Sequence, residues 1–146
     1  MVLGNLAAFN YGSCVVLPNE NFNAQASLEC VTKYSCTTIY GVPTMYIEYL
    51  KLHEKNPQAY NINSLYKGLM SGSFCPANLI QKTINILGMK QLAICYGMTE
   101  LSPVVSMNRP DDTLADRLET VGAIMPHVEA KIIDENGHIV PKNTIG

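Results

Sequence analysis

Apolar residues recur along the chain at two spacings, which predict strands that alternate with helices. Short β-branched or apolar runs predict strands at residues 15–17, 37–40, 68–70 and 92–95. Apolar residues three and four positions apart predict helices over residues 3–9, 23–34, 43–56 and 76–87. Strands that alternate with helices of this length are typical of an α/β fold: a doubly wound, mostly parallel sheet flanked by helices.

Local signals define the ends of these helices. Asn23 is a favoured N-cap residue, whereas Pro43 and Pro76 favour the first turn of a helix. Gly12 and Gly88 are expected just beyond helix C-termini. The inner faces of the longer helices are expected to carry Leu28 and Val31, then Met45, Tyr49 and Leu50, then Leu79, Ile80, Ile84 and Leu87.

The pattern changes after residue 100. Residues 108–120 are charged and irregular, which predicts a surface excursion with a turn or two of helix. Residues 128–133 alternate in polarity and precede Asn136-Gly137, which predicts a C-terminal β-hairpin. We expect Met1 to fall inside a helix and Gly146 inside this hairpin, so residues 1–146 are interpreted as part of a larger domain, truncated at both ends.

Composition narrows the class of protein. The chain has 146 residues, enough for one domain with its own core. Hydrophobic residues make up 47% and charged residues only 15%, which favours a core piece of a larger protein. The net charge of −2 and the scattered Lys and Arg residues argue against nucleic-acid binding.

Cysteine and histidine spacing argues against a zinc site and against a disulfide framework. The five cysteines are odd in number and show no C-x-x-C spacing, and the three histidines lack a matching ligand pair. Thiols within apolar runs favour a reducing compartment. The uncharged first 19 residues are interrupted by Asn5 and Asn10, lack a basic start, and are too short to span a bilayer.

The segment Tyr96-Gly97-Met98-Thr99-Glu100 follows the apolar run 92–95 and carries the most distinctive chemistry. A tyrosine ring can stack on a purine, a hydroxyl can bind a phosphate oxygen, and a carboxylate can bind Mg²⁺. Ligands of open α/β sheets bind beyond the carboxyl ends of strands. The alternative is a strand that runs into a turn, with Glu100 at the start of a short helix. The residues of this segment leave both interpretations open.

Three segments taken in order resemble the adenylate-forming superfamily of acyl-CoA synthetases, luciferases and peptide-synthetase adenylation domains. They are Ser71-Gly72-Ser73-Phe74-Cys75-Pro76, Tyr96-Gly97-Met98-Thr99-Glu100 and Val121-Gly122-Ala123-Ile124-Met125-Pro126-His127. The resemblance covers nearly the whole chain and is strongest to medium-chain acyl-CoA ligases. It implies a two-step reaction: a carboxylic acid and ATP give an acyl-adenylate, and coenzyme A then displaces AMP to give a thioester.

The resemblance also implies roles for residues. Tyr96 would stack on adenine, Thr99 would bind the α-phosphate, and Glu100 would bind Mg²⁺. The residues Ser71, Gly72 and Ser73 would form a lip over the other face of adenine. Gly97, Met98 and Gly122 would border the channel in which the acyl carboxylate meets the nucleotide.

The sequence departs from the family pattern at the lip. Many members have glycine or alanine where this chain has Ser71 and Ser73, and proline where it has Phe74. The phosphate loop, the ribose-binding Asp and the catalytic Lys of the family lie outside these residues, so the isolated chain is predicted to be inactive. Two alternatives remain open: an inactive nucleotide-binding or interaction protein of the same fold, and an unrelated doubly wound domain. The resemblance implies an intracellular protein, mitochondrial or cytoplasmic.

Overall fold

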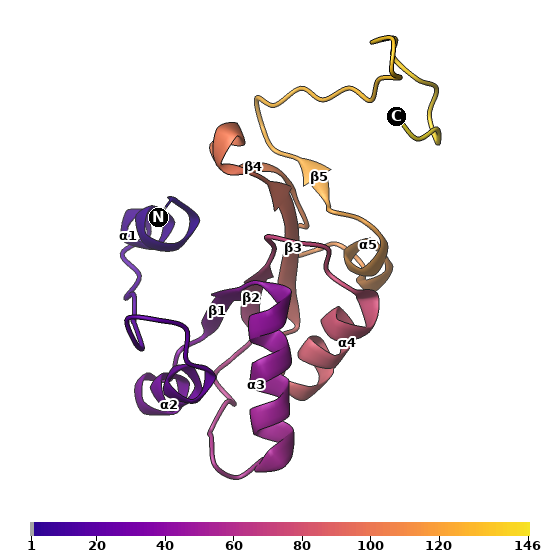
Figure 1. Ribbon diagram of the computed structural model, residues 1–146. Coiled ribbons are helices and arrows are strands. Elements are labelled where there is room, and N and C mark those ends of the chain that lie inside the picture. Colours follow the sequence, from indigo (N-terminus) through magenta and orange to yellow (C-terminus); the bar gives the residue numbers. More distant parts are fainter. Residues whose placement is uncertain (1) are drawn as a thin grey trace.

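A five-stranded sheet organises the structure, a computed structural model that describes residues 2–146 (Figure 1). The strands lie across the sheet in chain order: β1 (Thr38–Gly41), β2 (Lys67–Met70), β3 (Gln91–Gly97), β4 (Val104–Met107) and β5 (Ala123–Ile124). Strands β1, β2 and β3 are parallel, whereas β4 and β5 each pair antiparallel with the preceding strand. The predicted α/β class with an open, helix-flanked sheet is confirmed, but the sheet is mixed and its parallel part ends at β3.

Helices join the parallel strands, as the sequence predicts. The helical segments are η1 (Val2–Leu6, a π-helical turn), α1 (Ala7–Asn10), α2 (Ala24–Tyr34), α3 (Pro43–Lys55), α4 (Ala77–Ile86), the 3₁₀ turn η2 (Thr99–Leu101) and α5 (Leu114–Glu119). The Asn23 side chain caps α2 by accepting a hydrogen bond of 2.9 Å from the Ala26 N–H. Pro43 begins α3, and Gly88 follows the end of α4 with a positive φ of 72°. Among residues 2–146, no helix combines the length and apolar character needed to cross a membrane.

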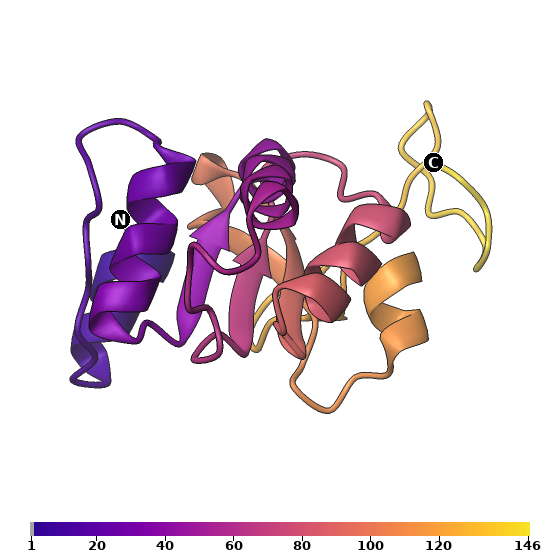
Figure 2. The same ribbon diagram turned by 90° about the horizontal axis from the view of Figure 1, so that it is seen from below.

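The core lies between the sheet and helices α3 and α4, which flank it in both views (Figures 1 and 2). Successive strand residues point to opposite faces of a sheet, so alternate positions of β2 and β3 reach the same helices. Tyr46 and Leu92 are fully buried at the centre of this layer. The predicted inner positions Leu28, Val31, Tyr49, Leu50, Leu79, Ile80 and Leu87 are all buried, whereas Met45 and Ile84 are partly buried.

A cavity of about 1430 Å³ lies between the sheet, α2 and the N-terminal segment. The alternate sheet residues Tyr40, Leu69 and Ala93 line it. Tyr40 is 48% exposed, which contrasts with the fully buried Tyr46 in the core. Within residues 2–146, the sheet face that packs on α3 and α4 is therefore covered more completely than the face that lines this cavity.

Four elements differ from the prediction. Residues 15–17 form no strand: Leu17 is 79% exposed, and a β-branched run needs a neighbouring strand to pair with. The C-terminal hairpin is reduced to a turn at Gly137 with one bridge, Ile133 to Ile139. Strands β4 and β5 were not predicted, although Val104-Val105 in β4 is a β-branched pair.

The buried Tyr46 hydroxyl gives a direct test of how α3 is fixed to the sheet. Its oxygen lies 2.9 Å from the Ile39 carbonyl oxygen and 3.1 Å from that of Leu69, on neighbouring strands. Burial raises the pKa of this hydroxyl, so it stays protonated and remains a donor. Tyr46→Phe is expected to lower the free energy of unfolding by about 1–2 kcal/mol in urea titrations, because a buried hydrogen bond is lost. Tyr40→Phe is the matched control and should change it by less than about 0.5 kcal/mol; equal effects would contradict this role for Tyr46.

Candidate nucleotide-binding site

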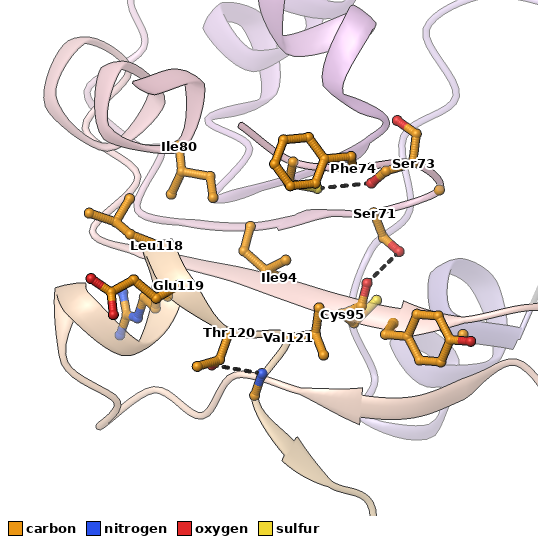
Figure 3. Close-up of a pocket in the computed structure, with 16 residues that line it drawn as sticks. Ser71, Ser73, Phe74, Ile80, Ile94, Cys95, Leu118, Glu119, Thr120 and Val121 are labelled. Carbon is orange, nitrogen blue, oxygen red and sulfur yellow. Dashed lines mark hydrogen bonds between the residues drawn. The ribbon is translucent and has the colours of Figure 1, made fainter. Parts of the chain in front are cut away.

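The carboxyl ends of three parallel strands meet at one edge of the sheet. Gly41 of β1 is paired with Met70 of β2, and Met70 is paired with Ile94 of β3. The loop that follows β2 therefore starts beside the end of β3. Its first residue, Ser71, donates its N–H to the Gly41 carbonyl at 3.3 Å and its hydroxyl to the Cys95 carbonyl at 2.8 Å (Figure 3). These bonds tie the loop to both outer strands of the parallel group.

The same loop is anchored again before α4 begins. The Cys75 thiol lies 3.4 Å from the Ser73 carbonyl oxygen and 3.7 Å from the Met70 carbonyl oxygen. Burial, with a smaller contribution from nearby Cys95, raises the pKa of Cys75, so its thiol stays protonated and can donate. Between the two anchors, Gly72 has a positive φ of 93° and packs closely on Val42. The loop therefore has a defined shape without a ligand.

A cavity of about 680 Å³ opens between this loop, the end of β3 and the turn after α5. A volume of this size is typical of small-molecule sites. Six residues predicted from the sequence line it: Ser71, Gly72, Ser73, Tyr96, Gly97 and Gly122. One cavity is thus bordered by residues from all three segments of the family resemblance: residues 71–73, Tyr96-Gly97 and Gly122.

Tyr96 presents an available aromatic ring at this cavity. It lies at the end of β3 opposite Ser106 of β4, and 48% of its surface is exposed. The two preceding residues, Ile94 and Cys95, are buried, so exposure begins at Tyr96. A planar base could therefore stack on the ring without displacing any core residue.

The other three predicted residues, Met98, Thr99 and Glu100, do not line the cavity. They follow Gly97 at the same edge of the sheet, where the chain forms η2 before returning as β4. All three are exposed, and neither Thr99 nor Glu100 uses its side chain in a hydrogen bond or ion pair with another residue of the described chain. Thr99 and Glu100 thus closely follow the cavity residue Gly97 in the sequence, and their side chains are exposed to solvent.

The chemistry of Glu100 fits a magnesium ion. Mg²⁺ prefers oxygen ligands and is often held by one or two carboxylates together with phosphate oxygens of the substrate. Within residues 2–146, no group of three or more His, Cys, Asp or Glu side chains could hold a metal by itself. A metal at Glu100 would therefore depend on oxygens of a bound ligand.

Two glycines that border the cavity have a structural reason to be glycine. A Cβ at Gly97 would overlap the Pro103 carbonyl, since β4 approaches the backbone of β3 closely where the pairing register shifts. A Cβ at Gly122 would overlap the backbone of Met107 and Asn108, and its φ of 79° disfavours other residues. Both glycines bring backbone segments together and thereby shape the wall of the cavity.

Arg117 is a cavity residue that the sequence analysis missed. It is only 8% exposed, and its guanidinium donates to the Lys90 carbonyl at 2.6 Å and the Pro110 carbonyl at 2.8 Å. It therefore fixes α5 to the turn before β3 and to the loop after β4. A capping box between Thr113 and Asp116 starts this helix and was visible in the sequence, but the distant carbonyl partners were not.

Comparison with known proteins assigns the family. The AMP-binding enzyme family matches residues 1–146, and the chain belongs to this family. The chain is 38% identical over 137 residues to the mitochondrial medium-chain acyl-CoA ligase ACSF2 of Danio rerio, covering 93% of this chain and 22% of that protein. It is 37% identical over 146 residues to ACSF2 of Homo sapiens, covering 99% of this chain and 23% of that protein. The chain thus spans less than a quarter of the length of these relatives.

A solved structure supports the fold. The anthranilate CoA ligase AuaEII in complex with anthranoyl-AMP superposes with a TM-score of 0.77 at 27% identity, covering 88% of this chain and 24% of that chain. The expectation of an adenylate-forming fold is confirmed by this likeness together with the family match.

Replacing Gly122 tests whether the backbone contact shapes the cavity wall. Gly122→Ala is expected to lower the free energy of unfolding by about 2–4 kcal/mol, because a methyl group would collide with Met107 and Asn108. Gly137→Ala is the matched control: its φ is 84°, but a Cβ there meets nothing within 4 Å. The control should cost only about 1 kcal/mol for the unfavourable φ. Equal losses in urea titrations would show that backbone conformation, and not the close approach, requires glycine at 122.

Proposed function

We propose that this chain provides the nucleotide-binding part of an ATP-dependent acid–thiol ligase that forms acyl-CoA through an acyl-adenylate. The observation that carries the proposal is the cavity at the carboxyl edge of β2 and β3. It brings the loop of residues 71–73 together with Tyr96 in a member of the AMP-binding enzyme family. The relatives reported above are named as acyl-CoA ligases, which supports coenzyme A as the acceptor.

The residues of the cavity would bind ATP through its base. Tyr96 would stack on adenine, a contact worth about 1–3 kcal/mol for an aromatic side chain and a base. The loop of Ser71, Gly72 and Ser73 would cover the other face of the base. Hydrogen bonds at Ser71 and Cys75 already fix this loop, so ordering it when ATP binds would cost little conformational entropy.

Thr99 and Glu100 would act on the phosphates. The Thr99 hydroxyl would donate a hydrogen bond to an α-phosphate oxygen, and the Glu100 carboxylate would hold Mg²⁺ on the phosphate side. When bound, Mg²⁺ neutralises negative charge that builds up on the phosphate oxygens. Both side chains lie beyond the cavity lining, so this role requires the phosphates to extend from the cavity towards η2.

The reaction divides into two displacements. A carboxylate oxygen of the acid forms a bond to the α-phosphorus, and the bond to the bridging oxygen breaks and releases pyrophosphate. The sulfur of coenzyme A then bonds to the acyl carbon, its proton is lost, and AMP leaves. Met98, Gly97 and Gly122 would border the acyl carboxylate during the first displacement.

The acid is proposed to be a medium-chain fatty acid, as in the names of the two ACSF2 relatives. The same names support a mitochondrial location for the protein, with the cytoplasm as the alternative. The partners are therefore small molecules: the acid, ATP and coenzyme A.

A second candidate is a nucleotide-binding protein that has lost the chemistry. The placement of Thr99 and Glu100 outside the cavity lining favours it, because a base could bind between residues 71–73 and Tyr96 without contacting them. The two candidates differ in what the Glu100 carboxylate does.

Glu100→Gln distinguishes the two candidates in the full-length protein. If Glu100 holds Mg²⁺, this variant should slow acid-dependent exchange between pyrophosphate and ATP by about 100-fold or more, as the loss of charge stabilisation at a reacting group typically does. Its melting temperature should stay unchanged, since Glu100 is exposed. Glu54→Gln, exposed on α3, is the control and should keep the parent rate. A parent rate in Glu100→Gln would remove the metal role, and an inactive parent would favour the second candidate.

Tyr96→Ala and Tyr96→Phe test the stacking role. The alanine variant should weaken binding of AMP by about 5- to 150-fold in calorimetry, whereas the phenylalanine variant keeps the aromatic face and should bind within about threefold of the parent. If both variants lose affinity equally, the hydroxyl and not the ring makes the contact.

A further inference from the structure

Three of the five cysteines lie around one cavity, away from the candidate nucleotide site. Cys14, Cys30 and Cys36 all line the cavity of about 1430 Å³ between the sheet, α2 and the N-terminal segment. All three are free thiols in the part of the chain that the structure describes. Cys14 is exposed, whereas Cys30 and Cys36 are partly exposed. A small molecule that enters this cavity therefore meets several thiols.

The end of α2 brings Cys36 back onto Cys30. Ser35 follows this helix in the left-handed conformation, with a φ of 51° and a ψ of 45°. A left-handed residue at a helix end turns the chain back, so the side chain that follows packs on the last turns of the helix. The Cys36 thiol accordingly donates to the Cys30 carbonyl, with 3.6 Å between sulfur and oxygen. Standard bond lengths put that oxygen about 2.4 Å from its own Cα, so the Cys36 sulfur lies within about 6 Å of the Cys30 Cα.

Contacts with the rest of the fold hold Cys36 in this place. Its carbonyl accepts a hydrogen bond of 2.8 Å from the Ser64 hydroxyl. The next carbonyl, that of Thr37, accepts one of 3.1 Å from the Lys67 N–H at the start of β2. The Cys36 side chain also packs against the hydrophobic core. The native fold therefore keeps the two cysteines together, so little further chain entropy is lost if their sulfurs become bonded.

We propose that Cys30 and Cys36 form a redox-active thiol pair, a modification site that a low-molecular-weight disulfide such as glutathione disulfide oxidises reversibly. Disulfides join residues whose Cα atoms lie about 4.4–6.8 Å apart, which suits neighbours in one helix-ending turn. Reversible disulfides of this kind are the ones expected in a reducing compartment. The pair lies just before β1, whereas the nucleotide cavity lies at the carboxyl ends of the strands, so this inference is independent of the proposed function.

The oxidation consists of two thiol–disulfide exchanges. The Cys30 sulfur, as the thiolate, bonds to one sulfur of glutathione disulfide, whose S–S bond breaks, and one glutathione leaves and takes up the proton. The Cys36 thiol then loses its proton, its sulfur bonds to that of Cys30, and the second glutathione leaves. Two cysteine thiols are thus oxidised while one glutathione disulfide is reduced to two glutathione molecules. Burial raises the pKa of Cys36, with smaller contributions from Cys30 and Cys14, which makes Cys36 the slower thiol for the first attack.

Peptide mapping by mass spectrometry tests this proposal on the full-length protein, treated with excess glutathione disulfide and then alkylated in denaturant. Trypsin and Glu-C together cut after Glu20, Glu29 and Lys33, so the three thiols of the cavity fall in separate peptides. The expected product joins residues 30–33 to residues 34–48, and treatment with dithiothreitol should restore both thiols. If both peptides are recovered unlinked, whether alkylated or carrying glutathione, the proposal is overturned.

Two matched variants identify the partner of Cys36. Cys14→Ser should keep the yield of the linked peptide within about twofold of the parent, whereas Cys30→Ser should lower the loss of free Cys36 by about tenfold or more. A product that joins the peptide ending at Glu20 to residues 34–48 would assign the bond to Cys14 and overturn the proposed pair. Because the linkage is mapped in the parent protein, it decides the question even if Cys30→Ser folds poorly.

Discussion

Two hydrogen bonds of Ser71 determine where the loop after β2 lies in the candidate site. A loop that leaves a parallel strand can turn in many directions, but Ser71 bonds to Gly41 of β1 through its N–H and to Cys95 of β3 through its hydroxyl. These two bonds place residues 71–74 against the end of β3, where Tyr96 lies. The shape of the cavity therefore follows from the parallel register of β1, β2 and β3, because that register brings three carboxyl ends to one edge.

The opposite wall depends on close backbone contacts. Gly97 and Gly122 allow β4 and the turn after α5 to approach neighbouring segments more closely than any side chain would permit. Arg117 then secures α5 by donating to two carbonyls from separate loops. The same residues thus hold backbone segments together and line the cavity. A glycine near a binding site can therefore be required for packing without touching the ligand.

Local sequence signals predicted most of the fold. Asn23, Pro43 and Gly88 marked helix ends because caps and ring constraints act within a few residues. The apolar run 92–95 marked β3, but pattern alone could not show that residues 15–17 lack a strand to pair with, or that β4 returns antiparallel. The segments around Ser71, Tyr96 and Gly122 were grouped by family resemblance, and their shared cavity follows only from sheet register. The carbonyl partners of Arg117 belong to Lys90 and Pro110, which lie outside its helix, so no local capping signal predicts them.

The central claim is that the loop after β2 and the end of β3 form one site for the adenine base. Photolabelling of the full-length protein with 8-azido-AMP, followed by peptide mapping by mass spectrometry, tests it most directly. The account predicts label within residues 71–75 and 96–98, and loss of that label with excess unmodified ATP. Label confined to other segments, or label that excess ATP leaves in place, would contradict it.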